Sequence, residues 1–85
     1  MQATKYYPIS KELDLEVSYF VTKIDNARFE AQENGDMELL DSSEEKFTAL
    51  LELEDNLIFK EGCFYVESKY YLLATECKNA YRLRH

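Results

Sequence analysis

An apolar residue occupies every odd-numbered position of residues 13–21, and the polar residues Asp14, Glu16 and Ser18 lie between them. An alternation with a period of two is typical of a β-strand that buries one face. The same segment also fits a helix, because Leu13, Val17 and Phe20 recur at spacings of four and three. We favour a strand, since β-branched and aromatic residues occupy the middle of the segment. A helix over residues 13–24 is the alternative.

An Asn-Gly pair at residues 34–35 is the most specific local signal in the chain. Asn-Gly favours the tight turn of a β-hairpin, in which both central residues take positive φ angles. Residues 28–32 and 37–40 flank this turn, so we predict a β-hairpin over residues 27–40. The motif fixes a turn and carries no chemistry.

A helix is predicted to begin at Ser42. Ser42 and Glu45 have the spacing of a capping box, in which each side chain binds a free backbone N–H. Glu44 adds negative charge to the first turn, where the helix dipole favours it. If the helix continues past Asp55, one side of it carries Phe47, Leu50, Leu51 and Ile58. In the alternative the helix ends at Asn56, because Asn tolerates the left-handed conformation of a helix end.

The last third of the chain is rich in aromatic and β-prone residues. Residues 57–60 and 63–66 flank Glu61-Gly62, which predicts a second β-hairpin. Residues 70–75 are expected to form a further strand. The competing interpretation is a C-terminal helix through Leu73, Cys77 and Tyr81.

These elements predict a single domain over residues 1–85, of the α+β class. The expected architecture is a small antiparallel β-sheet with one central helix packed on one face. The alternative is a mostly α-helical fold, a short helical bundle. A chain of this length buries roughly 60–65% of the surface that its unfolded form exposes. Little room is therefore left for a buried active-site cleft.

Negative charge is concentrated in the middle of the chain. The formal net charge is −7, and residues 30–55 hold ten acids against one base, Lys46. The ten acids are Glu30, Glu33, Asp36, Glu38, Asp41, Glu44, Glu45, Glu52, Glu54 and Asp55. On the predicted helix, Glu45, Glu52 and Asp55 lie opposite the apolar side. We interpret these acids as a docking surface for a basic partner, with an ordinary solvated face as the alternative.

Aromatic and basic residues supply a second candidate surface. The chain has seven Tyr and no Trp, and Tyr is enriched at protein interfaces. The candidate aromatic patch comprises Tyr65, Tyr70, Tyr71 and Tyr81. Near the C-terminus, Lys78, Arg82 and Arg84 form a short basic tail. This tail suits a clamp on the acidic segment or one half of a contact between copies.

Motifs for catalysis, metals and cofactors are lacking. The single histidine is His85, the last residue, so an internal Ser–His or Cys–His pair is not available. Cys63 and Cys77 are fourteen residues apart, which fits neither a zinc nor a redox motif. The acids around Gly35 lack the ligand order of an EF-hand. We therefore expect no enzymatic activity, no cofactor and no metal site.

The remaining properties indicate a protein of the cytoplasm. The longest apolar stretch, residues 70–74, is too short to span a bilayer. Two cysteines without a dense disulfide framework are expected to stay reduced, as in the cytosol. An acidic chain repels nucleic acid and anionic membrane surfaces, so we expect direct binding to neither.

The sequence therefore predicts a non-enzymatic binding protein that inhibits or regulates a basic, nucleic-acid-processing protein. Its acidic surface would imitate the charge of a nucleic-acid backbone. Small size and acidity suit an inhibitor from a phage or mobile element, such as an anti-CRISPR or anti-restriction protein. An immunity protein or antitoxin fits equally well, because it would also present acids to a basic active site. This setting rests on composition alone. The alternative is a homo-oligomer, such as a homodimer, or an accessory assembly subunit that binds through the Tyr-rich face.

Overall fold

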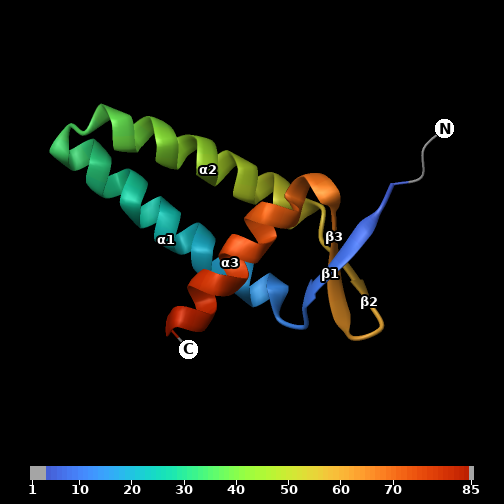
Figure 1. Ribbon diagram of the computed structural model, residues 1–85. Coiled ribbons are helices and arrows are strands. Elements are labelled where there is room, and N and C mark those ends of the chain that lie inside the picture. The colour runs from blue at the N-terminus through green and yellow to red at the C-terminus, as the bar shows by residue number, and fades with distance from the viewer. Residues whose placement is uncertain (1–3, 85) are drawn as a thin grey trace.

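Helices and one small sheet make up the computed structural model, which describes residues 4–84 (Figure 1). The elements are β1 (Tyr6–Ser10), α1 (Leu13–Asn34), α2 (Met37–Asp55), β2 (Ile58–Lys60), β3 (Cys63–Glu67), the 3₁₀ turn η1 (Ser68–Tyr70) and α3 (Tyr71–Arg84). Helices α1 and α2 form an antiparallel helical hairpin, and the sheet and α3 gather at its open end (Figure 1). The predicted α+β class with an antiparallel sheet is confirmed, but three helices take the place of the one central helix.

Helix α1 covers the segment for which we favoured a strand, so that prediction is wrong and the helical alternative is right. Leu13, Val17 and Phe20 are buried along one face of the helix. Leu15, which the alternation placed on the buried face, is 53% exposed. The alternation ends at Val21, whereas the helical spacing continues to the buried Ala31. The longer period decides the structure because it buries a continuous stripe.

The Asn-Gly pair joins two helices, so the predicted β-hairpin over residues 27–40 is wrong. Gly35 has a φ of 68°, and its N–H donates to the Gln32 carbonyl while the Asp36 N–H donates to the Ala31 carbonyl. This pair of bonds is the Schellman motif that ends many helices. The Asp36 carboxylate then accepts a hydrogen bond of 3.2 Å from the Leu39 N–H and caps α2.

Helix α2 begins at Met37 rather than at Ser42, so the predicted capping box is not formed. The Ser42 hydroxyl instead donates to the Leu39 carbonyl within the helix. The helix ends at Asp55, which agrees with the alternative prediction of an end at Asn56. The reason given for that end is wrong, because Asn56 has a φ of −116° and is not left-handed. On the predicted apolar side, Leu50 is buried but Leu51 is 41% exposed.

The sheet confirms the second predicted hairpin. Strands β2 and β3 pair around Glu61 and Gly62, whose φ angles of 53° and 78° are those of a tight hairpin turn. Ile58 lies in β2, as the predicted hairpin had it, and not on a helix that continues past Asp55. Strand β1 pairs with the other edge of β3, and Tyr7 lies opposite Val66. The resulting order is β1-β3-β2, all antiparallel.

The segment after η1 is the helix α3, so the predicted strand over residues 70–75 is wrong and the competing C-terminal helix is right. Ala74 and Cys77 are fully buried at a spacing of three, and Tyr81 continues the same side as a half-buried residue. A strand would have placed neighbouring residues on opposite faces. The buried side of α3 instead follows the helical period.

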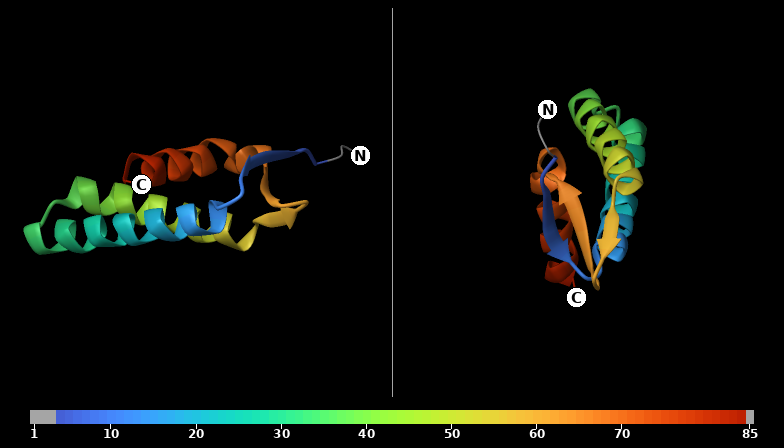
Figure 2. Two further views of the ribbon diagram at one scale, coloured as in Figure 1. Left: turned by 90° about the horizontal axis from the view of Figure 1, so that it is seen from below. Right: turned by 90° about the vertical axis from the view of Figure 1, so that its right-hand side faces the viewer.

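The hydrophobic core lies where the sheet, α3 and the sheet-proximal halves of α1 and α2 meet. It consists of Leu13, Val17, Phe20, Leu50, Leu53, Val66, Tyr70, Ala74 and Cys77. Figure 2 shows α3 as a layer beside the helical hairpin, with the distal half of the hairpin projecting away from both α3 and the sheet. The radius of gyration is accordingly 14.1 Å, against about 12 Å for a compact chain of this length. Within residues 4–84, no helix is both long and apolar enough to cross a membrane.

Candidate functional site

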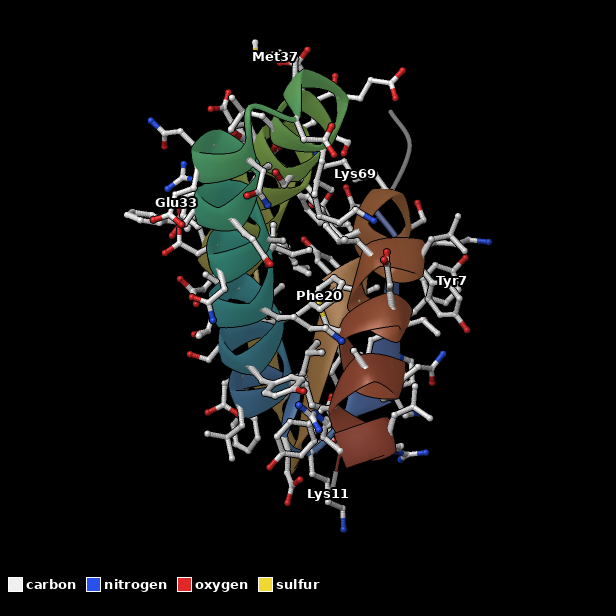
Figure 3. The ribbon with its side chains drawn as sticks, turned by 90° about the vertical axis from the view of Figure 1, so that its left-hand side faces the viewer. Tyr7, Lys11, Phe20, Glu33, Met37 and Lys69 are labelled. Atoms are coloured by element: carbon white, nitrogen blue, oxygen red, sulfur yellow. The ribbon has the colours of Figure 1, made fainter. Side chains whose placement is uncertain are left out.

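The ten acids predicted as a docking surface are all exposed, and all belong to the helical hairpin or its turn. Glu30 and Glu33 lie in the last turns of α1, and Asp36 lies in the turn. The other seven lie on α2. In Figure 3, Glu33 and Met37 mark the tip of the hairpin, far from Lys11 at the opposite end of the molecule. The distal half of the hairpin therefore carries seven of the ten acids away from the core, while Glu52, Glu54 and Asp55 lie at the end of α2 that meets the sheet.

The outer face of α2 carries a straight row of polar side chains. The row consists of Glu38, Asp41, Glu45, Thr48, Glu52 and Asp55. Alternating spacings of three and four place these residues on one face of a helix, along about 25 Å of its axis. Asp41, Glu44, Glu45 and Thr48 line a shallow groove of about 530 Å³ on this face. Three of the four residues that line this groove are acids.

Two of the ten acids are engaged in holding the fold. Asp36 caps α2, as described above. The Glu52 carboxylate accepts a hydrogen bond of 2.9 Å from the Tyr70 hydroxyl, which joins α2 to the buried end of η1. Burial raises the pKa of Tyr70, and the bond to Glu52 raises it further. Glu52 thus stabilises the packing of α2 against η1, and the free part of the acidic row is centred on Asp41 and Glu45.

The cations near α2 point away from its outer face. Lys46 Nζ lies 2.8 Å from Glu76 Oε1 and bridges α2 to α3. Arg28 lies 2.7 Å from the Asp25 carboxylate, and its guanidinium covers the Phe47 ring at 4.5 Å. These are the ion pairs found within residues 4–84, and neither touches Asp41, Glu44 or Glu45. Within the described residues, Asp41, Glu44 and Glu45 therefore take part in no ion pair.

The four tyrosines of the predicted aromatic patch lie in different surroundings. Tyr70 is buried in the core. The Tyr71 ring packs edge-on against Tyr7 at 5.6 Å, and the Tyr81 ring packs edge-on against a tyrosine of α1 at 5.7 Å. Tyr65 is half-buried in the central strand β3. Tyr71 is the one member of the four that is largely exposed, so these residues do not offer a shared contact surface.

Sequence reasoning missed a buried carboxylate. Glu16 is 3% exposed, and its Oε1 accepts a hydrogen bond of 2.6 Å from the Ser10 hydroxyl. It borders a cavity of about 660 Å³ that is also lined by Lys11, Tyr81 and Arg82. The strand assignment had placed Glu16 on a solvated face. On a helix, Glu16 follows the buried Leu13 by three residues, and this spacing is the signal that would have found it.

The two cysteines of the chain lie in different surroundings. Cys77 is fully buried, and burial raises the pKa of its thiol to about 12. Cys63 is half-buried, and its Sγ lies 3.6 Å from the Ser10 carbonyl oxygen. A thiol is reactive as the thiolate, so Cys77 is inert near neutral pH. Residues 4–84 contain no group of three or more His, Cys, Asp or Glu that could hold a metal ion.

Comparisons with known proteins found no matching family model, no similar curated protein and no similar solved structure. The function of this chain is therefore inferred from its own surface. Its distinctive feature is the acidic helical hairpin, with an uncompensated groove on α2.

Proposed function

We propose that this chain is a non-enzymatic binding protein that docks the outer face of α2 against a basic, nucleic-acid-processing protein. The observation that carries the proposal is the row of acids on one rigid helix, with no ion pair at Asp41, Glu44 or Glu45. A basic partner can form ion pairs with these carboxylates, which form none within the described residues.

The charge density of α2 supports imitation of a nucleic acid. The row holds five acids over about 25 Å, which is one negative charge per about 5 Å of helix axis. A single strand of B-DNA carries one per about 3.4 Å. The two densities are of the same order, so a groove built for a phosphate backbone would meet a similar potential on α2. Charge complementarity of this kind speeds encounter and selects the partner.

Such a protein would inhibit or regulate its partner by occupying the basic groove in place of nucleic acid. A cytoplasmic inhibitor from a phage or mobile element, of the anti-CRISPR or anti-restriction kind, is the setting that fits the size and charge of the chain. An immunity protein or antitoxin would act through the same surface.

A charge-matched pair of variants tests the proposal. The first neutralises the groove by Asp41→Asn, Glu44→Gln and Glu45→Gln, three exposed acids without a hydrogen bond to the fold. The control makes the same change in net charge elsewhere, by Glu12→Gln, Asp14→Asn and Glu61→Gln. Each protein is used for affinity capture from lysate of the source cells, with elution by a salt gradient and mass spectrometry.

The wild type and the control are expected to capture the same basic, nucleic-acid-binding protein and to release it at moderate salt. The groove variant is expected to lose it. Capture that survives in the groove variant would refute docking through α2. Equal loss in both triple variants would mean that net charge matters and that the groove does not.

A further inference from the structure

The buried carboxylate of Glu16 borders a cavity of about 660 Å³ where the end of β1, the start of α1 and the last turns of α3 meet. Small-molecule sites in proteins have volumes of roughly 300–1,000 Å³, so this cavity has room for a small ligand. In Figure 3, Lys11 of its lining lies at the opposite end of the molecule from Glu33 and Met37 at the tip of the hairpin. The cavity is therefore separate from the groove on the outer face of α2.

The Glu16 carboxylate is buried without a cation beside it. Glu16 is 3% exposed, and its Oε1 accepts a hydrogen bond of 2.6 Å from the Ser10 hydroxyl, a length typical of a hydroxyl bound to an ionised oxygen. Within residues 4–84 Glu16 forms no ion pair, and a buried charge without a partner is costly. An ionised carboxylate has about four acceptor positions, so Glu16 can accept further hydrogen bonds from a cation that enters the cavity.

Two cations and a second carboxylate complete the charged lining of the cavity. Lys11, Glu12 and Arg82 are all exposed, and none of them forms an ion pair within the described residues. With Glu16, the lining holds two positive and two negative side chains, so its formal charge is zero. A ligand of one sign therefore meets repulsion as well as attraction, whereas a ligand with both signs can pair with both kinds of side chain.

The apolar part of the lining is held in place by the fold. Ile9 packs against the hydrophobic core and borders the cavity. Tyr81 is half-buried at the other side of the cavity, and its ring packs edge-on against Tyr19 with 5.7 Å between the ring centroids. Small-molecule sites typically combine such apolar contacts with a few polar groups that fix the orientation of the ligand. A ligand with an apolar side chain beside its charged groups fits this lining.

We propose that this cavity binds an α-amino acid with an apolar side chain. The ammonium group of the ligand donates to the Glu16 carboxylate. The carboxylate of the ligand accepts from Lys11 and from the guanidinium of Arg82, whose forked donors match the geometry of a carboxylate. The apolar side chain of the ligand lies against Ile9 and Tyr81. This site does not rest on the proposed function, because it shares no residue with the groove on α2.

Titration of the isotope-labelled full chain, followed by its amide chemical shifts, tests the site with three probes of similar size. L-Phenylalanine carries both charges, phenethylamine lacks the carboxylate and hydrocinnamate lacks the ammonium group. L-Phenylalanine is expected to bind roughly ten-fold more tightly than either analogue, because each analogue gives up one set of charge-assisted hydrogen bonds. The amide signals of residues 9–16 and 78–84 are expected to move, whereas those of Glu33 and Met37 are not.

Two variants identify which side chain binds which end of the ligand. Glu16→Gln is expected to weaken the binding of L-phenylalanine and phenethylamine roughly ten-fold and to leave that of hydrocinnamate no weaker. Arg82→Gln is expected to weaken the binding of L-phenylalanine and hydrocinnamate and to leave that of phenethylamine no weaker. Lys23→Gln is the matched control, because Lys23 is an exposed cation of α1 outside the cavity lining, and it is expected to change none of the affinities.

A lack of saturable shifts with L-phenylalanine at millimolar concentration would overturn the proposal. So would equal affinities for the three probes, an affinity for L-phenylalanine that neither substitution lowers, or an Arg82→Gln variant that weakens all three probes alike. Circular dichroism verifies the fold of each variant. Unfolding is not expected, because Arg82 is exposed and a glutamine oxygen at position 16 can still accept the bond from Ser10.

Discussion

The buried thiol of Cys77 makes the stability of the fold fall steeply in alkali. Its pKa is raised from an ordinary value of 9.0 to about 12, with burial as the largest cause. In the unfolded chain the thiol therefore ionises near pH 9, while in the folded chain it stays protonated. The unfolded state binds fewer protons across this range, so the free energy of unfolding decreases as pH rises.

The magnitude follows from the two pKa values. A shift of three units corresponds to about 4 kcal/mol when the titration is complete, and about 3 kcal/mol of this is lost by pH 11. A domain of this size has a total stability of roughly 4–13 kcal/mol. Loss of about 3 kcal/mol is therefore a large share of the total stability of the fold. Tyr70 and Lys69 also have raised pKa values in the folded chain. Their deprotonation therefore also lowers the free energy of unfolding as pH rises.

Urea unfolding followed by circular dichroism, with a reductant present, isolates the contribution of Cys77. The wild type and Cys77→Ala are compared at pH 8 and at pH 11. At pH 8 the variant is expected to be the less stable protein, because it loses a buried sulfur atom. By pH 11 the wild type should lose about 3 kcal/mol of unfolding free energy that the variant keeps. The difference in stability between the two proteins should therefore narrow or change sign. An unchanged difference at the two pH values would refute the argument that Cys77 is buried as a neutral thiol.

Two further predictions concern the helical hairpin, and urea unfolding measures both. Leu50→Ala is expected to cost about 2–5 kcal/mol because Leu50 is fully buried, whereas Leu51→Ala should cost less than about 1 kcal/mol; equal effects would contradict the orientation of α2. Asp36→Ala is expected to cost about 1 kcal/mol of stability through loss of the helix cap. Asp36→Asn should retain most of that stability, because the Asn side-chain oxygen can also accept the bond. A similar loss for both Asp36 variants would point to charge rather than capping.

The predictable parts of the fold are those where local signals have one interpretation. Glu61-Gly62 lies between two short β-prone runs and forms the β2–β3 hairpin. The Asn34-Gly35 pair has two interpretations, because positive φ at Gly35 suits both a hairpin turn and a helix end. The flanking segments decide between them. Those segments are long enough to bury a helical stripe that meets α3 and the sheet, which local spacing does not reveal.

The exposure of the ten acids was predictable as a set because carboxylates are rarely fully buried. Which individual acids are hydrogen-bonded or buried was not predictable. Glu52 and Tyr70 are eighteen residues apart, and their hydrogen bond exists because η1 folds back over the end of α2. The burial of Glu16 likewise follows from the contact between α1 and the end of β1. Such assignments depend on which elements pack together, and the sequence pattern left α1 and α3 undecided.

The exposure of the acids on α2 has a consequence for how the proposed contact responds to salt. The outer face of α2 carries exposed carboxylates, whose attraction for a basic partner falls as the screening length drops to about 8–10 Å at ordinary ionic strength. Moderate salt should therefore release a partner that is held through these carboxylates. A contact made mainly by buried apolar side chains would depend little on salt, so the salt dependence of capture distinguishes the two kinds of contact.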